Sequence, residues 1–461
     1  MIFFLITLGA FHKVFPRHQW LVLLVASYAF YCFFSVKAAC LLLAVCLVNY
    51  LSGLFIDAAS EKSKKKFLVA AIIIDVALLV LFKYSNFVID NINFWRMEKL
   101  SLWNLILPVG ISFFIFQSIS YVLDVYLEKV KPERHLGYFL LYLSFFPKLM
   151  QGPIERAGYL LPQLRRPYKF DAEEFNGGLK LILIGLVKKL VIADRLALLT
   201  APVFGQVTDF SGPMLWLAVY AYTFQIYYDF SGYTDMARGM AKLFGIELSE
   251  NFQKPYLATN IPDFWRRWHM TFSFWLRDYL FTPLMAAFRE RGAWGNVAAA
   301  MVTFTVCGLW HGATWGFILF GLIHGVYMAV SMLTFKKSDQ FVKQLGIPKN
   351  FVQAWRVVVT FHLVAFSFIF FRANSLTDVG YILSHAFGPV KNVNPFSFMS
   401  SFEVGLVALA VVLLSTVRTK LAGRIAGKLE YFDNYWFYGV LANLIIFFGV
   451  HIHAPFIYFK F

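Results

Sequence analysis

Two histidines lie in surroundings that could support acid–base chemistry, and the first is His311. It occurs in VCGLWHGATWGF, within a long apolar region from Val297 to Met332. An ionisable side chain in such a region is a functional hypothesis by default, because placing it in hydrocarbon is costly. Burial disfavours the charged imidazole, so a neutral nitrogen could accept a proton as a general base. A core histidine that hydrogen-bonds a neighbouring carbonyl explains the same residues equally well.

The spacing around His311 predicts an aromatic neighbour on the same helix. Cys307, His311 and Trp315 are four residues apart, so they would share one face of a continuous helix. The indole of Trp315 would then lie beside the imidazole. His324 follows 13 residues after His311, roughly 140° around the same helix, and is expected on another face.

The second histidine, His269, lies in the segment DFWRRWHMTFSFWLRDYL, Asp263 to Leu280. On a continuous helix it would share a face with Trp265 and Arg266. Such a face could form the polar wall of a tunnel, where Arg266 or Arg267 binds phosphate and a Trp side chain stacks on a ligand. From spacing alone a helix at the membrane interface is the more economical explanation, since Trp and Arg both favour that level.

Two polar regions interrupt the apolar pattern. The stretch from Asp229 to Asp263 is too polar to span a membrane, so we expect non-helical backbone that lines a cavity. Its Asp229, Asp235 and Arg238 could position a substrate, although salt-bridged scaffolding is the simpler explanation. The charged, proline-rich stretch from Pro147 to Arg195 predicts short helices at the cytoplasmic interface. We expect no metal site, because cysteine spacings typical of metal ligands are absent.

The composition identifies the elements that must position these residues as membrane helices. Hydrophobic residues make up 59% of the 461 and charged residues only 15%, which excludes a water-soluble fold and disorder. There are 42 Lys and Arg against 26 Asp and Glu, a net charge of +16. In a membrane protein such cations collect in short cytoplasmic loops near anionic lipid, so no nucleic-acid partner is expected.

Continuous apolar runs predict an all-α polytopic membrane protein with roughly ten to thirteen transmembrane and re-entrant helices. The basic segments EKSKKK, Glu61–Lys66, and EKVKPER, Glu128–Arg134, are separated by two predicted spans, so both should face the cytoplasm. Neither a linker nor an internal repeat is visible, which predicts a single membrane domain over residues 1–461. Clear candidate spans cover residues 20–34, 38–57, 67–87, 108–126, 212–228, 297–309, 315–333, 352–371, 402–417 and 435–451.

Several ordered motifs resemble the membrane-bound O-acyltransferase (MBOAT) family. They are GLWHG around His311, FWRRWH and FWLRDYL around His269, and also LPVGISFFIFQSISYVLDVY, FFPKLMQGPIER, YYDFSGYTDMARG and the closing FIYFKF. The likeness extends from about Leu81 to Phe461. It is greatest to the bacterial branch that contains the alginate O-acetylation membrane protein and the teichoic-acid D-alanyl transfer protein. After RDYLF the chain departs from that branch with TPLMAAFRERGAWGN, which leaves the modified polymer open.

The resemblance implies a helical bundle around a funnel or tunnel. There an acyl group would pass from a cytoplasmic thioester to a hydroxyl reached from the other side of the membrane. It implies that His311 is catalytic and that His269 is catalytic or positions the donor. The residues that could bind donor or substrate are Trp265, Arg266, Trp268, Trp310, Trp315 and Asp229.

The expected reaction is O-acetylation of a cell-surface polysaccharide, alginate or another exopolysaccharide, by an enzyme of the inner membrane. Acetyl-CoA or a phosphopantetheine thioester would be the donor, with no tightly bound cofactor, and an extracytoplasmic protein or polysaccharide the acceptor. His311 would remove the hydroxyl proton. His269 or an indole N–H of Trp265 or Trp268 would stabilise the oxyanion. D-alanyl transfer from a carrier protein to teichoic acid is the alternative, and a non-catalytic transporter or scaffold the alternative from another class.

Overall fold

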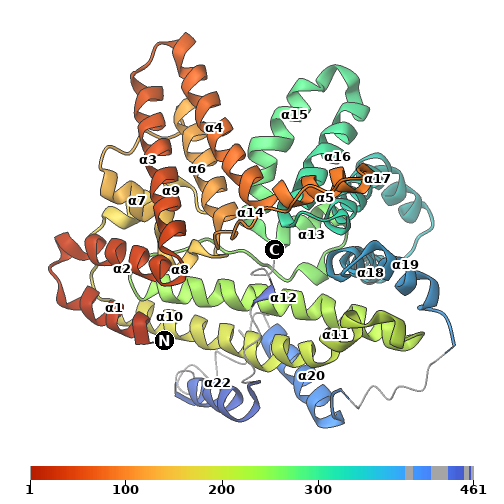
Figure 1. Ribbon diagram of the computed structural model, residues 1–461. Coiled ribbons are helices and arrows are strands. Elements are labelled where there is room, and N and C mark those ends of the chain that lie inside the picture. Colours follow the sequence, from red (N-terminus) through yellow and green to blue (C-terminus); the bar gives the residue numbers. More distant parts are fainter. Residues whose placement is uncertain (1, 390–397, 417–434, 451–455, 458–461) are drawn as a thin grey trace. The chain divides into compact units, whose positions relative to one another are not determined.

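The computed structural model describes residues 2–389, 398–416, 435–450 and 456–457. All regular structure in these residues is helical, so the predicted all-α class is confirmed (Figure 1). Most of the closing FIYFKF motif lies outside the described residues.

The chain divides into two compact units. Unit 1 comprises Met1–Leu179 and Ala237–Glu250, and unit 2 comprises Lys180–Met236 and Asn251–Phe461. Two helices, α10 (Ala172–Leu186) and α12 (Pro213–Lys242), contribute residues to both. The single domain that the sequence suggests stays a prediction.

Unit 1 is built around α3, α4 and α6, which pack against one another (Figure 1). Its helices are α1 (Ile2–Lys13), α2 (Gln19–Phe34), α3 (Val36–Ala58), α4 (Glu61–Lys83), α5 (Ser85–Trp95), α6 (Ile111–Tyr126), α7 (Leu136–Ser144), α8 (Phe146–Leu149) and α9 (Ala157–Arg165). Lys64 Nζ lies 3.1 Å from Glu128 Oε1, and Arg134 lies 3.7 Å from Asp57. The two basic loops therefore meet at one end of these helices, as the sequence predicts.

Unit 2 contains a hairpin of two long helices, α16 and α17, that pack along each other. Its helices are a π-helical segment (Val187–Ala193), α11 (Asp194–Gly205), α13 (Ile261–Arg267), α14 (Met270–Leu276), a second π-helical segment (Arg277–Phe281), α15 (Thr282–Ala287), α16 (Gly292–His311), α17 (Trp315–Gln344), α18 (Lys349–Arg372), α19 (Leu376–His385), α20 (Ser401–Thr416) and α22 (Tyr435–Phe448).

Fewer helices than hydropathy predicts are long enough to span a membrane. In the described residues, four are long and apolar enough: α3, the helix ending at His311, the apolar part of α17, and α18. The pair α4 and α5, bent by 60°, makes a fifth if it is one span. Other predicted spans coincide with shorter helices, such as α2 and α6 with 16 residues each. The larger number of spans stays a prediction.

One predicted break is wrong, because α12 continues as a helix from Pro213 to Lys242. The charges of Asp229 and Asp235 are compensated by Lys189 and Lys188 from the π-helical segment, so the helix keeps its regular backbone bonds. Beyond Lys242 the chain is irregular up to α13, as expected. The other polar region does contain the short helices α8 and α9, but it continues as the long α10.

Candidate active site in unit 2

His311 is the last residue of α16, at the turn of the α16–α17 hairpin. The two helices approach closely at Gly308 and Gly321. A Cβ at Gly308 would lie 2.2 Å from the Phe317 carbonyl oxygen, and one at Gly321 would lie 2.2 Å from that of Phe304. Small residues at such crossings allow helix backbones to touch. The partial negative charge at the end of α16 favours the cation that forms when the imidazole accepts a proton.

Aromatic rings enclose the His311 side chain, which is only 3% exposed. Among the described residues, the rings that contact it come from α14, α16, α17 and α18 and include Phe272, Trp310, Phe317, Phe320 and Phe371, with centroids 5.0–6.4 Å from the imidazole. The predicted helical face shared by Cys307, His311 and Trp315 is wrong, because α16 ends at His311 and Trp315 begins the next helix, where it is 52% exposed.

His269 lies at a break between two short helices instead of within one. Helix α13 ends at Arg267 and α14 begins at Met270, while His269 has φ 43° and ψ 53°, in the left-handed region. A residue other than glycine is uncommon there and costs about 1–3 kcal/mol, and such residues cluster at functional sites. The predicted continuous helical face is therefore wrong, and the break turns His269 into the protein interior, where it is fully buried.

Asn251 fixes the tautomer of His269. The Asn251 Oδ1 accepts the Thr271 backbone N–H at 3.1 Å and the Thr271 hydroxyl at 3.0 Å, so this atom is the amide oxygen. The same oxygen lies 3.2 Å from His269 Nδ1, so Nδ1 must carry the hydrogen and donate it. Burial lowers the pKa of His269 to about 3, so the ring is neutral and Nε2 holds its lone pair.

The structure brings His269 and His311 together through two stacked rings. Phe272 and Trp310 stack at 4.2 Å between centroids, and each ring also contacts both imidazoles at 5.0–5.9 Å. The two histidines, 42 positions apart in the sequence numbering, are therefore one ring apart in space. Electrostatic interactions are stronger in such apolar surroundings than in water, so a base placed there interacts strongly with charge that develops during a reaction.

A cavity of about 310 Å³ in unit 2 is lined by two of the predicted donor-binding residues, Trp265 and Arg266. Its walls are mostly apolar, and Ser273 and Arg277 add further polar groups. Trp268 is buried and stacks on Phe264 instead. The continuous funnel or tunnel to His311 stays a prediction.

Asp229, another predicted substrate-binding residue, belongs to a buried ion-pair cluster. Lys189 Nζ lies 2.8 Å from both Asp229 and Asp194, and Lys188 Nζ lies 2.5 Å from Asp235. The Asp229 carboxylate also accepts a backbone N–H from Ile457 at 2.9 Å. The contacts favour the scaffolding interpretation over substrate binding.

Sequence reasoning did not predict the contacts of His324 and Asn251. His324 is buried and accepts the indole N–H of Trp265 on Nδ1 at 3.2 Å, and its Nε2 lies 2.9 Å from the Ser367 hydroxyl. The sequence spacing predicts His311 and His324 on different faces of one helix, but they lie on two helices of a hairpin, so that angle does not apply. Phe320 contacts both imidazoles. The indole of Trp265 is thus already engaged and is not an oxyanion donor in this structure.

The fold and the site together define a helical membrane protein with two imidazoles buried among aromatic rings, suited to proton transfer during acyl transfer. The sequence pattern of the membrane-bound O-acyltransferase family matches residues 23–374, and the chain belongs to that family. It is a multi-pass membrane enzyme that transfers acyl groups to hydroxyls.

Similar proteins include three with different stated acceptors. "Probable alginate O-acetylase AlgI" of Pseudomonas putida is 34% identical over 91% of this chain and 84% of that protein. "Peptidoglycan O-acetyltransferase" of Helicobacter pylori is 35% identical over 84% of this chain and 76% of that protein. "Teichoic acid D-alanyltransferase" of Bacillus subtilis is 31% identical over 58% of this chain and 69% of that protein.

Proposed function

We propose that this enzyme transfers an acetyl group from a cytoplasmic thioester, acetyl-CoA, to a hydroxyl on the extracytoplasmic side of the inner membrane. The acceptor belongs to a cell-surface polysaccharide or to a partner protein that passes the acetyl group to it. The proposal is carried by the pair His269 and His311, joined by the Phe272–Trp310 stack. Similarity to the O-acetylating relatives over most of the chain supports acetyl as the acyl group.

His311 acts as the general base in this proposal. It removes the hydroxyl proton as the oxygen attacks the thioester carbonyl, because a free alcohol is a poor nucleophile near neutral pH. The tetrahedral intermediate collapses by breaking the carbon–sulfur bond, and the protonated imidazole returns its proton to the leaving thiolate. The end of α16 favours the transient cation.

His269 has a different role from the one that its spacing suggests. With Nδ1–H held by Asn251, its Nε2 accepts a hydrogen bond and cannot donate one to an oxyanion. We infer that it accepts a hydrogen bond from an acceptor hydroxyl or a bound water and so positions that group. Trp265 and Arg266 line the neighbouring cavity, where a thioester chain and its phosphate would find an apolar wall and a guanidinium.

A donor-swap assay on the purified full-length protein tests the acyl group. Radiolabelled acetyl-CoA and a carrier protein loaded with D-alanine are offered in parallel, and label transfer to a polysaccharide acceptor is measured. The expected result is acetyl transfer that is lost in His311→Ala. Transfer of D-alanine alone would replace the proposal by the teichoic-acid reaction, and transfer of neither with a folded protein would contradict it.

A further inference from the structure

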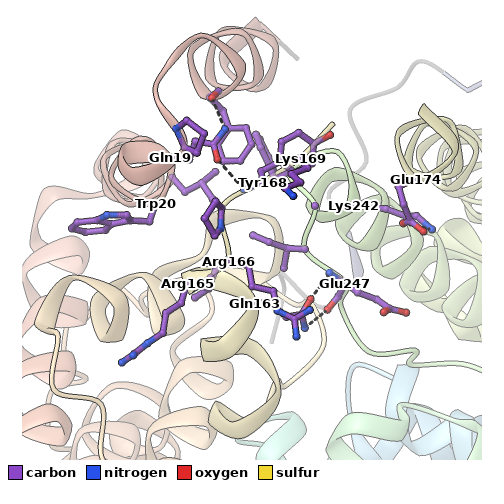
Figure 2. Close-up of a pocket in the computed structure, with 18 of the residues that line it drawn as sticks. Gln19, Trp20, Gln163, Arg165, Arg166, Tyr168, Lys169, Glu174, Lys242 and Glu247 are labelled. Atoms are coloured by element: carbon purple, nitrogen blue, oxygen red, sulfur yellow. Dashed lines mark hydrogen bonds and ion pairs between the residues drawn. The ribbon is translucent and has the colours of Figure 1, made fainter. Parts of the chain in front are cut away.

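Unit 1 contains a polar pocket of about 370 Å³ that is separate from the candidate active site of unit 2 (Figure 2). Three segments form most of its walls: the turn before α2 with the start of α2, the end of α9 with the chain that follows it, and the end of α12 with the turn that follows it. Two glutamines hold these walls together. Gln19 accepts the Tyr168 backbone N–H at 3.1 Å, and Gln163 exchanges two hydrogen bonds with the Glu247 backbone at 2.8 and 3.1 Å. The pocket is therefore a built feature and not a gap between loose loops.

A tight contact between two walls supports this conclusion. Gly245 has φ 70°, and a Cβ there would lie 2.3 Å from the Tyr168 ring. Only glycine allows both this backbone conformation and the close approach of the ring.

The lining carries an excess of positive charge. Of its five cations, Lys242 pairs with Glu174 at 2.9 Å and Arg165 pairs with Glu133. Within the part of the chain that the structure describes, the other three make no ion pair: Arg17, Arg166 and Lys169.

The acidic residues of the lining offset only part of this charge. The Asp171 carboxylate accepts the backbone N–H groups of Glu173 and Glu174 at the start of α10 but keeps its charge. Glu174 is paired with Lys242, which leaves Asp171 and Glu247 as the other two lining carboxylates. The pocket thus presents three cations without an ion pair against two carboxylates.

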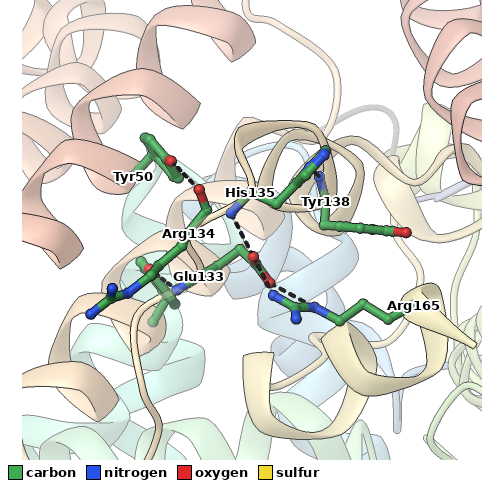
Figure 3. A network of polar contacts seen from close by, with 7 residues as sticks. Tyr50, Glu133, Arg134, His135, Tyr138 and Arg165 are labelled. Carbon is green, nitrogen blue, oxygen red and sulfur yellow. Dashed lines mark hydrogen bonds and ion pairs between the residues drawn. The ribbon is translucent and has the colours of Figure 1, made fainter.

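The pocket adjoins the loops that the positive-inside tendency assigns to the cytoplasm. Glu133 of the basic loop accepts hydrogen bonds from the Arg165 guanidinium and from the His135 backbone N–H (Figure 3). The Arg134 carbonyl of the same loop accepts the Tyr50 hydroxyl at 2.7 Å. Arg165 and Tyr138 of the pocket are thereby tied to the cytoplasmic end of unit 1.

We propose that this pocket binds a phosphate group at the cytoplasmic face, with Arg17, Arg166 and Lys169 as its ligands. Guanidinium groups bind phosphate through paired N–H donors, and a lysine adds a point charge. The phosphate belongs either to a soluble nucleotide-bearing molecule, such as the CoA part of a thioester donor, or to the headgroup of an anionic phospholipid. The assignment does not depend on which acyl group the enzyme transfers.

The test is a binding titration on the purified full-length protein with two probes. Adenosine 3′,5′-bisphosphate represents the soluble source, and dihexanoyl phosphatidylglycerol represents the lipid source, with dihexanoyl phosphatidylcholine as its uncharged counterpart. The test variant is Arg17→Gln/Arg166→Gln/Lys169→Gln. The matched control, Lys62→Gln/Lys65→Gln/Lys66→Gln, removes the same charge from exposed lysines of the neighbouring basic segment.

We expect one of the two anionic probes to bind at least tenfold more weakly to the pocket variant than to the control. Loss of bisphosphate binding assigns the soluble source, and loss of phosphatidylglycerol binding assigns the lipid. Equal affinities of both anionic probes for the pocket variant and the control overturn the proposal. All substituted residues are exposed, and Arg17→Lys/Arg166→Lys, which keeps the charges, should retain most of the binding. No acyl group is involved, so failure of the acetyl-transfer proposal would not affect this result.

Discussion

Unit 2 buries two clusters of titratable side chains, and they differ in whether charged partners surround them. Around Lys188 and Lys189 every cation faces a carboxylate at 2.5–2.8 Å. Around His269 and His311 the partners among the described residues include aromatic rings and one amide oxygen. Matched charges fix backbone geometry but leave no group ready to react, whereas the neutral His269 keeps a basic nitrogen. The contacts of the ion-pair cluster favour a structural role, and we assign the chemistry to the cluster of imidazoles and aromatic rings.

The largest effect should come from removing the base. His311→Ala should lower acetyl transfer by about 10²–10⁴-fold, the usual contribution of a general base. The measurement is turnover per inserted molecule. The matched control is His324→Ala, which removes another buried histidine and should lower the free energy of unfolding by about 1–3 kcal/mol while turnover is kept. Equal losses of turnover in both variants would mean that His311 is only a packing residue.

Substitutions in the ion-pair cluster should lower the stability of the protein and leave its turnover unchanged. Asp235→Ala leaves Lys188 buried without its carboxylate and should lower the free energy of unfolding by about 3–5 kcal/mol. Denaturant or thermal unfolding in detergent measures the loss. The double variant Lys188→Met/Asp235→Leu removes both charges and should recover most of it. Two results together would place the cluster in the active site: a double variant as unstable as the single one, and loss of turnover in the folded molecules of either variant.

Acid should destabilise the protein through His269. The pKa of this histidine is about 3 in the folded state, below its ordinary 6.5, so the unfolded chain binds more protons at low pH. Its contribution to stability is full above pH 6.5 and is lost as the pH falls toward 3. Between pH 7.5 and 5.5 the loss is about 1.4 kcal/mol. The difference in unfolding free energy between the two pH values should be smaller for His269→Gln than for the native chain. An unchanged difference in His269→Gln would show that this ring is not kept neutral by burial.

The smallest effect should come from the residue that orients His269. Asn251→Ala removes the oxygen that accepts Nδ1–H, and with one hydrogen bond worth about 1 kcal/mol we expect turnover to fall roughly fivefold. Asn251→Asp keeps an acceptor at that position and should retain most of the turnover. Steady-state kinetics on both variants measures the difference. If Asn251→Asp lost as much turnover as Asn251→Ala, the hydrogen-bond acceptor at position 251 would not be the feature that supports turnover.

Much of the fold could be predicted because its signals are local. Each of the ten candidate spans overlaps a helix in the described residues, since each apolar run carries its own signal. The position of His311 in an apolar helix and the shared end of the two basic loops also followed from the sequence. The break at His269 did not, because its left-handed backbone depends on Asn251 and Thr271, whose contacts with each other no spacing rule describes.

The amino-acid sequence by itself determined that this chain is an all-helical membrane protein of the O-acyltransferase family, because apolar runs and ordered motifs are properties of consecutive residues. Only the tertiary structure decided that α12 continues through its aspartates, that two stacked rings join His269 to His311, and that three cations gather beside the cytoplasmic loops. The reason is physical. Burial and charge compensation arise between groups far apart in the chain, and their energies exist only once folding has placed those groups within a few ångströms of each other.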